Sequence, residues 1–379
     1  MKKVLPYIIG IVCIGLASSI LHGVGIFKIA SYHYFLYSDI PNFFSKAAIS
    51  GWPYINSQLE YPVLTGLFMR LTAILGGNLR GYYIANSVLL VALAVVSTFL
   101  LYRMLRQSSA QVLPSAERNK LWRYWIFAPS MLVFSVYNFD LLAIFFVVIA
   151  MYSVWKGRDL WAAFFLALGT WAKLYPVFYF LPLLLKQDSW RKRINIVLIA
   201  GAVTLALNLP FAIANFDSWA YFFTFNSGRV STFDSIWTIF RWSFPQLQDK
   251  NAINFLSLPI FAFWYFWAVW KYRGESLFKS WYLATLIFMM TNKVFSPQYL
   301  LWLLPFFVVL PAPKYWKFLI FEFSNLIILF LTLSWFFGGQ NLDYFYASVP
   351  LILIKYGMMF GFYRDIAWRK LYYRTLPYN

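Results

Sequence analysis

The chain has 379 residues, of which 61% are hydrophobic, 23% aromatic and only 12% charged. A soluble globular domain carries about twice that charged fraction, so the composition excludes an ordinary soluble fold and indicates a chain solvated mostly by lipid. The net charge of +19 does not indicate nucleic-acid binding, because the basic residues lie mostly in short segments between apolar runs, where they set membrane topology.

The first apolar run, about residues 4–27, follows Lys2 and Lys3. A cleavable signal peptide is the alternative interpretation, but the run is long enough to span a membrane and no small-residue cleavage site follows it. We therefore expect an uncleaved first helix whose N-terminus lies in the cytoplasm.

Further apolar runs follow, separated by basic segments. Alternating sides from a cytoplasmic start gives about twelve spans with both ends of the chain inside. Several runs are shorter than the roughly 20 residues of a full span, which indicates broken or tilted helices that line a cavity. We predict one all-α polytopic domain, residues 1–379, in a bacterial cytoplasmic membrane. The later runs are about 82–101, 124–137, 139–155, 161–172, 175–185, 194–213, 253–270, 277–291, 299–310, 318–337 and 345–362.

Two long segments, residues 28–81 and 214–252, are expected on the outer side. Within the first, the apolar stretch 61–77 contains Arg70. We expect this stretch to lie in or dip into the outer leaflet, because a crossing would move the basic cluster Arg103–Arg123 outside.

Asp39 follows the first helix and is expected near the membrane surface. A carboxylate there can take the proton of an attacking hydroxyl group during a transfer reaction. The alternative is a helix N-cap with Pro41 in the first turn, and a cap would also hold the carboxylate still. Glu60 in the same segment is either a second functional carboxylate or a solvated residue before a turn at Tyr61.

Lys173 and Lys293 break the charge rule, because each lies at a turn expected outside. Arg229 is a similar cation in the second long segment. A lipid phosphate would pair with such side chains, whereas snorkelling toward head groups explains them without a function. Asp140 either caps an apolar run or takes part in a site, and Glu322 within a span is either functional or structurally paired.

Metal and cofactor chemistry has little support in the residue inventory. One cysteine and two histidines exclude an internal disulfide and a multi-histidine zinc site. The sequence contains no Asp-x-Asp pair and no phosphate-cradling glycine loop. We therefore expect no metal and no cofactor, and the energy for any reaction must come from an activated substrate or a gradient.

The order of motifs in the first long segment resembles multi-pass glycosyltransferases of the GT-C superfamily. Further strings, spread over about residues 30–310, are similar to those of glycosyltransferase family 87. The first-segment motifs are Asp39, Gly51-Trp52-Pro53-Tyr54 and Glu60-Tyr61-Pro62, and the family strings are Asn138–Ala143, Ala172–Pro176 and Asn292–Tyr299.

This resemblance implies a GT-C type bundle that takes a hexose, expected to be mannose, from a polyprenyl-phosphate donor in the membrane. It implies an inverting transfer to a hydroxyl of a glycan or glycolipid acceptor on the outer face, with Asp39 as the general base. It also implies that basic side chains bind the donor phosphate, for which we choose Lys173, Arg229 and Lys293. Further substrate contacts are expected from Glu60, Tyr61, Asn138, Asp140 and Gln298.

Two rival functions remain at this stage, and within the enzyme class a lipid-linked glycan polymerase or ligase also remains open. A lipid-linked sugar flippase or transporter shares the polytopic body and broken helices, although no internal repeat of the kind common in transporters is evident. In a structural or assembly subunit, substitution of Asp39 would have no effect.

Overall fold

The computed structural model describes residues 2–27, 36–45, 51–108 and 119–370. These residues form helices and turns, and within these ranges no β-strand occurs. Arg118 of the predicted basic cluster, and residues 28–35 and 46–50 of the first long segment, lie outside the described residues. The all-helical prediction is therefore confirmed for the described part of the chain.

Long apolar helices identify a multi-pass membrane protein. In the described ranges, six helices are long and apolar enough to cross a membrane. Their outward surfaces carry large apolar side chains, such as Phe255 and Phe263, which are 79% and 77% exposed and suit contact with lipid. The six are α1 (Leu5–Gly23), α3 (Leu79–Ser108), α9 (Trp190–Ala214), α12 (Lys250–Lys271), α15 (Tyr315–Phe337) and α16 (Leu342–Ala367).

Shorter helices fill the interior of the bundle. α6 and α13 are buried on most of their surface, so their apolar side chains contact protein rather than lipid. Because these helices fall short of a full span, the structure does not decide the predicted count of about twelve crossings. The unbroken ones are α6 (Asp140–Trp155), α7 (Asp159–Ala172) and α13 (Leu277–Thr291).

Three predicted runs are divided into two helical segments each, and a proline lies at or next to the start of one segment in each run. Pro129, Pro176 and Pro297 each occupy the first turn of a new helical segment. Proline fits there because its missing N–H has no partner in a first turn, whereas it disrupts a helix interior. The segments are π-helical η4 (Trp122–Ile126) with α5 (Pro129–Phe134), η5 (Tyr175–Tyr179) with α8 (Phe180–Leu185), and η7 (Pro297–Trp302) with α14 (Leu304–Val309).

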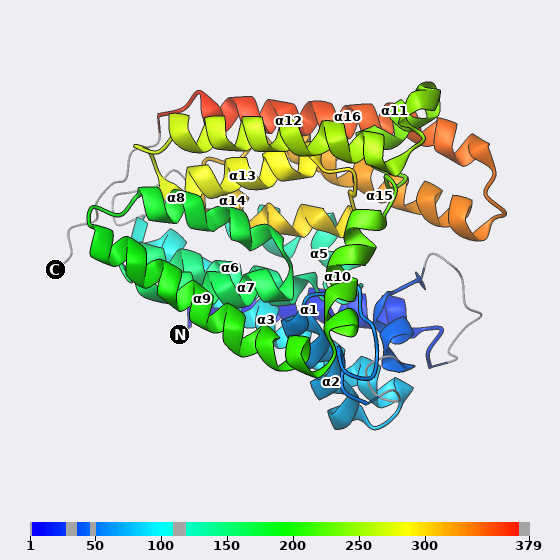
Figure 1. Ribbon diagram of the computed structural model, residues 1–379, viewed down its shortest axis with the longest axis horizontal. Coiled ribbons are helices and arrows are strands. Elements are labelled where there is room, and N and C mark those ends of the chain that lie inside the picture. Colours follow the sequence, from blue (N-terminus) through cyan, green and yellow to red (C-terminus); the bar gives the residue numbers. More distant parts are fainter. Residues whose placement is uncertain (1, 28–35, 46–50, 109–118, 371–379) are drawn as a thin grey trace.

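The two long segments meet at one end of the bundle. α1 begins and α16 ends at the left of Figure 1, whereas α2 (Val63–Gly76), α10 (Phe216–Gly228) and α11 (Ile236–Ser243) lie toward the right. The first segment also contains the 3-10 turn η2 (Ile40–Phe43), and the second contains η6 (Pro245–Leu247). The described parts of residues 28–81 and 214–252 thus contribute to the same end of the molecule.

The ambiguous stretch 61–77 forms α2, which has 14 residues. At about 1.5 Å per residue it is roughly 21 Å long, shorter than the hydrocarbon core of a bilayer. It ends at Gly77, whose φ of 66° is the left-handed conformation that glycine adopts readily. Ile74 and Leu75 are exposed, at 60% and 63%. This geometry suits a helix within one leaflet, and its depth in the membrane stays a prediction.

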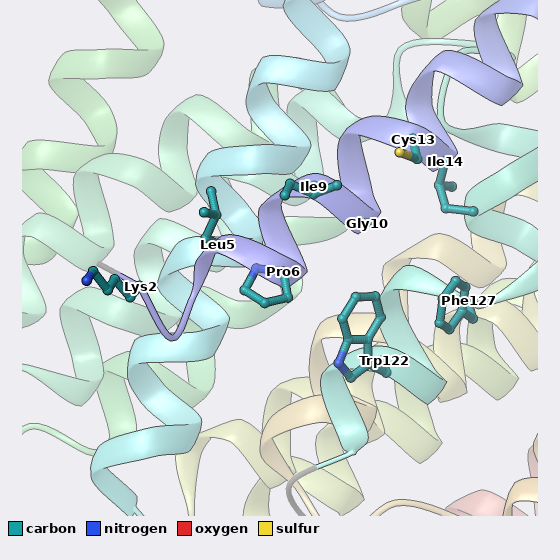
Figure 2. Close-up of a pocket in the computed structure, with 9 residues that line it drawn as sticks. All are labelled: Lys2, Leu5, Pro6, Ile9, Gly10, Cys13, Ile14, Trp122 and Phe127. Atoms are coloured by element: carbon teal, nitrogen blue, oxygen red, sulfur yellow. The ribbon is translucent and has the colours of Figure 1, made fainter.

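The first half of α1 packs on the broken run through Trp122. Figure 2 shows Trp122 and Phe127 facing α1, and their rings stack with centroids 5.1 Å apart. A Cβ atom at Gly10 would lie 2.6 Å from the Trp122 ring, so glycine permits this close approach. The groove here holds about 470 Å³ and its lining contains no carboxylate.

Glu322 in α15 has a structural partner. Its two carboxyl oxygens accept hydrogen bonds from the backbone N–H and the hydroxyl of Ser130, at 2.7 and 3.0 Å. These bonds fix the start of α5, so the structure supports the pairing alternative for this buried acid.

Candidate active site

A cavity of about 710 Å³ lies where the two long segments meet the ends of the interior helices. Its wall includes polar groups from the first segment and from the segments that follow α7, α10 and α13. Residues that are distant in the sequence therefore share one space. The predicted site residues that line it are Asp39, Glu60, Tyr61, Lys173, Arg229, Lys293 and Gln298.

The backbone around Asp39 is fixed to the core of the bundle. The Asp39 N–H donates to the Tyr137 carbonyl at 2.9 Å, and the Ser38 hydroxyl donates to the same oxygen at 2.8 Å. Asp39 occupies the N-cap position of η2, but its side chain makes no capping hydrogen bond within the described chain. The capping role is thus not realised, and Asp39 is one of the residues that line the cavity.

The surroundings of Asp39 make its carboxyl group a stronger base than an exposed aspartate. Burial raises its pKa to about 6, because a charged carboxylate is costly away from water. A hydrogen bond with Tyr37 and the charge of Lys173 act in the opposite direction, and the acids Asp140 and Glu60 raise the pKa further. At neutral pH the group is mostly ionised and can still accept a proton.

Lys173 lies directly after α7 and is held from several sides. Its ammonium group is 3.2 Å from Asp140 Oδ2, and its side chain is only 18% exposed. The same nitrogen lies 5.0 Å from the Tyr61 ring centroid and 5.7 Å from that of Tyr299. The Thr65 hydroxyl donates to the Ala172 carbonyl at 2.7 Å, which ties α2 to this end of α7.

Asp140 is oriented by an aromatic stack that the sequence did not reveal. Its Oδ1 accepts a hydrogen bond from Trp302 Nε1 at 2.7 Å. The Trp302 ring stacks on Tyr175 and on Tyr299, with centroids 4.1 and 3.9 Å away. An aromatic residue in an apolar run is too common to signal such a role, so only the fold identifies Trp302.

Asn138 and Asp140, which are predicted to contact substrate, are not among the residues that line this cavity. Both are buried, at 0% and 1% exposure, and Asp140 stands behind Lys173 rather than in the open cavity. Asn138 Oδ1 accepts from the Asp140 N–H at 3.0 Å, which fixes the start of α6. The physical reason is the ion pair, because the buried Asp140 carboxylate is neutralised by Lys173. Of the two partners, Lys173 is the one that lines the cavity.

The other two predicted cations lie on neighbouring segments. Lys293, in the turn after α13, donates from Nζ to the Ser227 carbonyl at 2.9 Å. Arg229 follows directly after α10, and its guanidinium carbon lies over the Phe225 ring, 5.6 Å from the ring centroid. The Thr232 N–H donates to the Lys293 carbonyl at 3.2 Å, which joins the two cation-bearing segments.

The wall that carries Glu60 and Tyr61 is also anchored. The Tyr54 hydroxyl donates to the Tyr61 and Pro62 carbonyls at 2.9 and 2.8 Å. Asn226 of α10 donates to the Glu60 carbonyl at 3.3 Å. Among the residues described, no group of three or more His, Cys, Asp or Glu side chains could hold a metal ion.

Comparison with known proteins gives one family. The family model for glycosyltransferase family 87 matches residues 59–297, more than half of the chain. Lys173, Arg229 and Lys293 fall inside the matched range, whereas Asp39, α15 and α16 fall outside it. No curated protein matches the chain.

Proposed function

This chain belongs to glycosyltransferase family 87, and we propose that its cavity transfers a hexose, expected to be mannose, from a polyprenyl-phosphate donor. The acceptor is a hydroxyl group of a glycan or glycolipid. One observation carries the proposal. Asp39, whose side chain makes no helix-capping hydrogen bond, lines the same cavity as the cations Lys173, Arg229 and Lys293.

The proposed reaction is a direct displacement. Ionised Asp39 accepts the proton of the acceptor hydroxyl as that oxygen forms a bond to the anomeric carbon of the sugar. The bond between the anomeric carbon and the donor phosphate oxygen breaks, and its electron pair leaves with polyprenyl phosphate. Attack from the opposite side inverts the configuration, so a β-linked donor gives an α-linked product.

The cations are proposed to stabilise the leaving phosphate without a metal or cofactor. Arg229 and Lys293 come first in this role, since they lie on joined segments of the cavity wall. Lys173 is already paired with Asp140. Its charge also lowers the pKa of Asp39, so it is proposed to influence the base as well as the donor phosphate. Arginine and lysine both bind phosphate oxygens through charge-assisted hydrogen bonds.

We also propose that the cavity faces the outer side of a bacterial cytoplasmic membrane and that both chain ends lie in the cytoplasm. The position of most basic segments between the apolar runs supports this orientation. Apolar groups of the cavity wall, including Phe225 and Leu258, are suited to the first units of the prenyl chain. The membrane lipid and the glycan acceptor are then the partners of the protein.

The test is transfer by the purified full-length protein in liposomes that contain polyprenyl-phosphate mannose and candidate glycan or glycolipid acceptors. We expect a new α-linked product, detected by mass spectrometry and assigned by NMR. Matched donors with other hexoses determine the sugar. Movement of the lipid-linked sugar across the bilayer without any new glycosidic bond would instead identify a flippase or transporter.

A further inference from the structure

A buried ion pair joins α16 to the segment that carries Arg229. Lys355 lies about halfway along α16 and is 0% exposed. Its Nζ is 3.7 Å from Asp234 Oδ2 and donates to the Asp234 carbonyl at 3.2 Å. The same nitrogen lies 3.7 Å from the centroid of the Phe295 ring. One lysine therefore contacts both the segment after α10 and the turn after α13.

These two segments carry the proposed phosphate-binding cations and are locked to each other. The Thr232 hydroxyl donates to the Phe295 carbonyl at 2.7 Å and accepts from the Phe295 N–H at 2.8 Å. The Ser235 hydroxyl donates to the Asn292 carbonyl at 3.3 Å. Lys293 thus lies between two anchored residues, and Arg229 lies shortly before the anchored Thr232.

α16 is bound to this assembly at a second point as well. The hydroxyl of Tyr356, next to Lys355, accepts a hydrogen bond from the Ile236 N–H at 3.1 Å. Asp234 falls within residues 59–297, whereas α16 lies beyond that range. The C-terminal helix therefore supplies an anchor for a segment that the family pattern covers.

A buried lysine–carboxylate pair is a poor source of net stability, because removing both charges from water costs about as much as their attraction returns. A role in holding one arrangement is better attested for such pairs. Lys355 is fully buried, so it acts through other residues rather than on a substrate.

We propose that Lys355 and Asp234 are positioning residues that hold the cation-bearing segments, and with them Arg229 and Lys293, in the geometry that binds the donor phosphate. This inference rests on the proposed function. It makes α16 a determinant of donor affinity, and it predicts that the acceptor, which meets the Asp39 side of the cavity, is bound independently of the pair.

The experiment compares full-length variants in liposomes by their separate KM values for polyprenyl-phosphate mannose and for the acceptor. The double variant Asp234→Asn/Lys355→Met removes both buried charges together and avoids leaving one unpaired. We expect its donor KM to rise about tenfold or more, with the acceptor KM within about twofold, because phosphate contacts are charge-assisted. Lys355→Arg, which retains the charge, is expected to keep the donor KM within about threefold of the wild type.

The matched control removes a second ion pair, whose lysine is buried, at the other end of the bundle. Lys279 is 0% exposed and lies 2.8 Å from Glu275, and its ammonium group also donates to the Ala367 carbonyl. The variant Glu275→Gln/Lys279→Met should leave the donor KM unchanged. A wild-type donor KM in the folded Asp234→Asn/Lys355→Met variant would overturn the proposal, and so would an equal rise of both KM values.

Two further measurements keep the proposal testable under other outcomes. If the double variant does not fold, Thr232→Val breaks the link to Phe295 without touching a charge, and an unchanged donor KM there overturns the proposal. If the wild type makes no product, equilibrium binding of polyprenyl phosphate replaces the KM. Wild-type binding without transfer contradicts the proposed function, and equal binding by the double variant contradicts the positioning role.

Discussion

Lys173 and Asp140 form an ion pair at the back of the cavity, with Nζ 3.2 Å from Oδ2 and the acid fully buried. The acid is held in turn by the indole N–H of Trp302 at 2.7 Å. This arrangement fixes a positive charge that acts on Asp39, while the ion pair as a whole carries no net charge. Burial is the main influence on the pKa of Asp39, and the two charges of the pair adjust that pKa in opposite directions.

The first prediction concerns this influence. Lys173→Met removes the charge that lowers the pKa of Asp39 and leaves Asp140, which raises it. The acidic limb of the pH profile of kcat/KM should therefore move to higher pH. Lys173→Arg retains the charge and should leave the limb within a few tenths of a pH unit. An unmoved limb in Lys173→Met would show that Lys173 does not act on the base.

The second prediction is the pH dependence of the wild type. Asp39 works only when ionised, and burial raises its pKa to about 6. The value of kcat/KM, which reports the free enzyme, should thus be constant above about pH 7 and fall tenfold per pH unit well below 6. A profile that stays flat down to pH 5 would contradict the assignment of Asp39 as the base.

The same shift has a consequence for stability. Because the folded state binds the Asp39 proton more tightly than the unfolded state, this group favours folding less as the pH rises from about 4 to about 6. Asp39→Asn removes that charge and should be at least as stable as the wild type at pH 7. Thermal unfolding in detergent checks this point and provides the folding control for the variant.

The third prediction separates the cavity cations from an ordinary loop charge. Arg229→Gln and Lys293→Gln should each raise the donor KM about tenfold or more, because each removes a charge-assisted contact with the phosphate. Arg241→Gln is the matched control: Arg241 lies on α11, in the same long segment but outside the proposed site. Equal effects of all three substitutions would indicate a general electrostatic influence instead of a phosphate site.

The fourth prediction tests the anchoring of the first long segment. A Cβ atom at Gly66 would clash with the Tyr54 hydroxyl, which donates a hydrogen bond to the Tyr61 carbonyl. Gly66→Ala should destabilise the fold by about 1–3 kcal/mol and lower activity by displacing Tyr61. Gly201 in α9 has open space, so Gly201→Ala should be neutral or stabilising. Thermal unfolding and the transfer rate measure both effects.

The sequence allowed much of the fold to be predicted, because apolar runs and basic interruptions are local signals. The predicted run 277–291 coincides with α13, and the short run 124–137 is broken at Pro129. The charge rule singled out Lys173 and Lys293 through their unusual position, and both line the cavity. Their roles in binding the donor remain predictions.

Contacts between distant parts of the chain could not be predicted in this way. Nothing local to Trp302 shows that it meets Asp140, and nothing local to Lys355 shows that it meets Asp234. Asp140 is a further example. Its identity and position in the sequence indicate a polar role, but the packing of α7 against α6, which brings Lys173 to it as a partner, is not a local signal.

The central claim is that Asp39 takes the proton of the acceptor hydroxyl. The direct measurement is the initial rate of product formation by purified Asp39→Asn in liposomes with saturating donor and acceptor, beside the wild type. Loss of the base predicts a rate at least about a hundredfold lower, with donor binding and thermal unfolding preserved. Turnover equal to that of the wild type would contradict the claim.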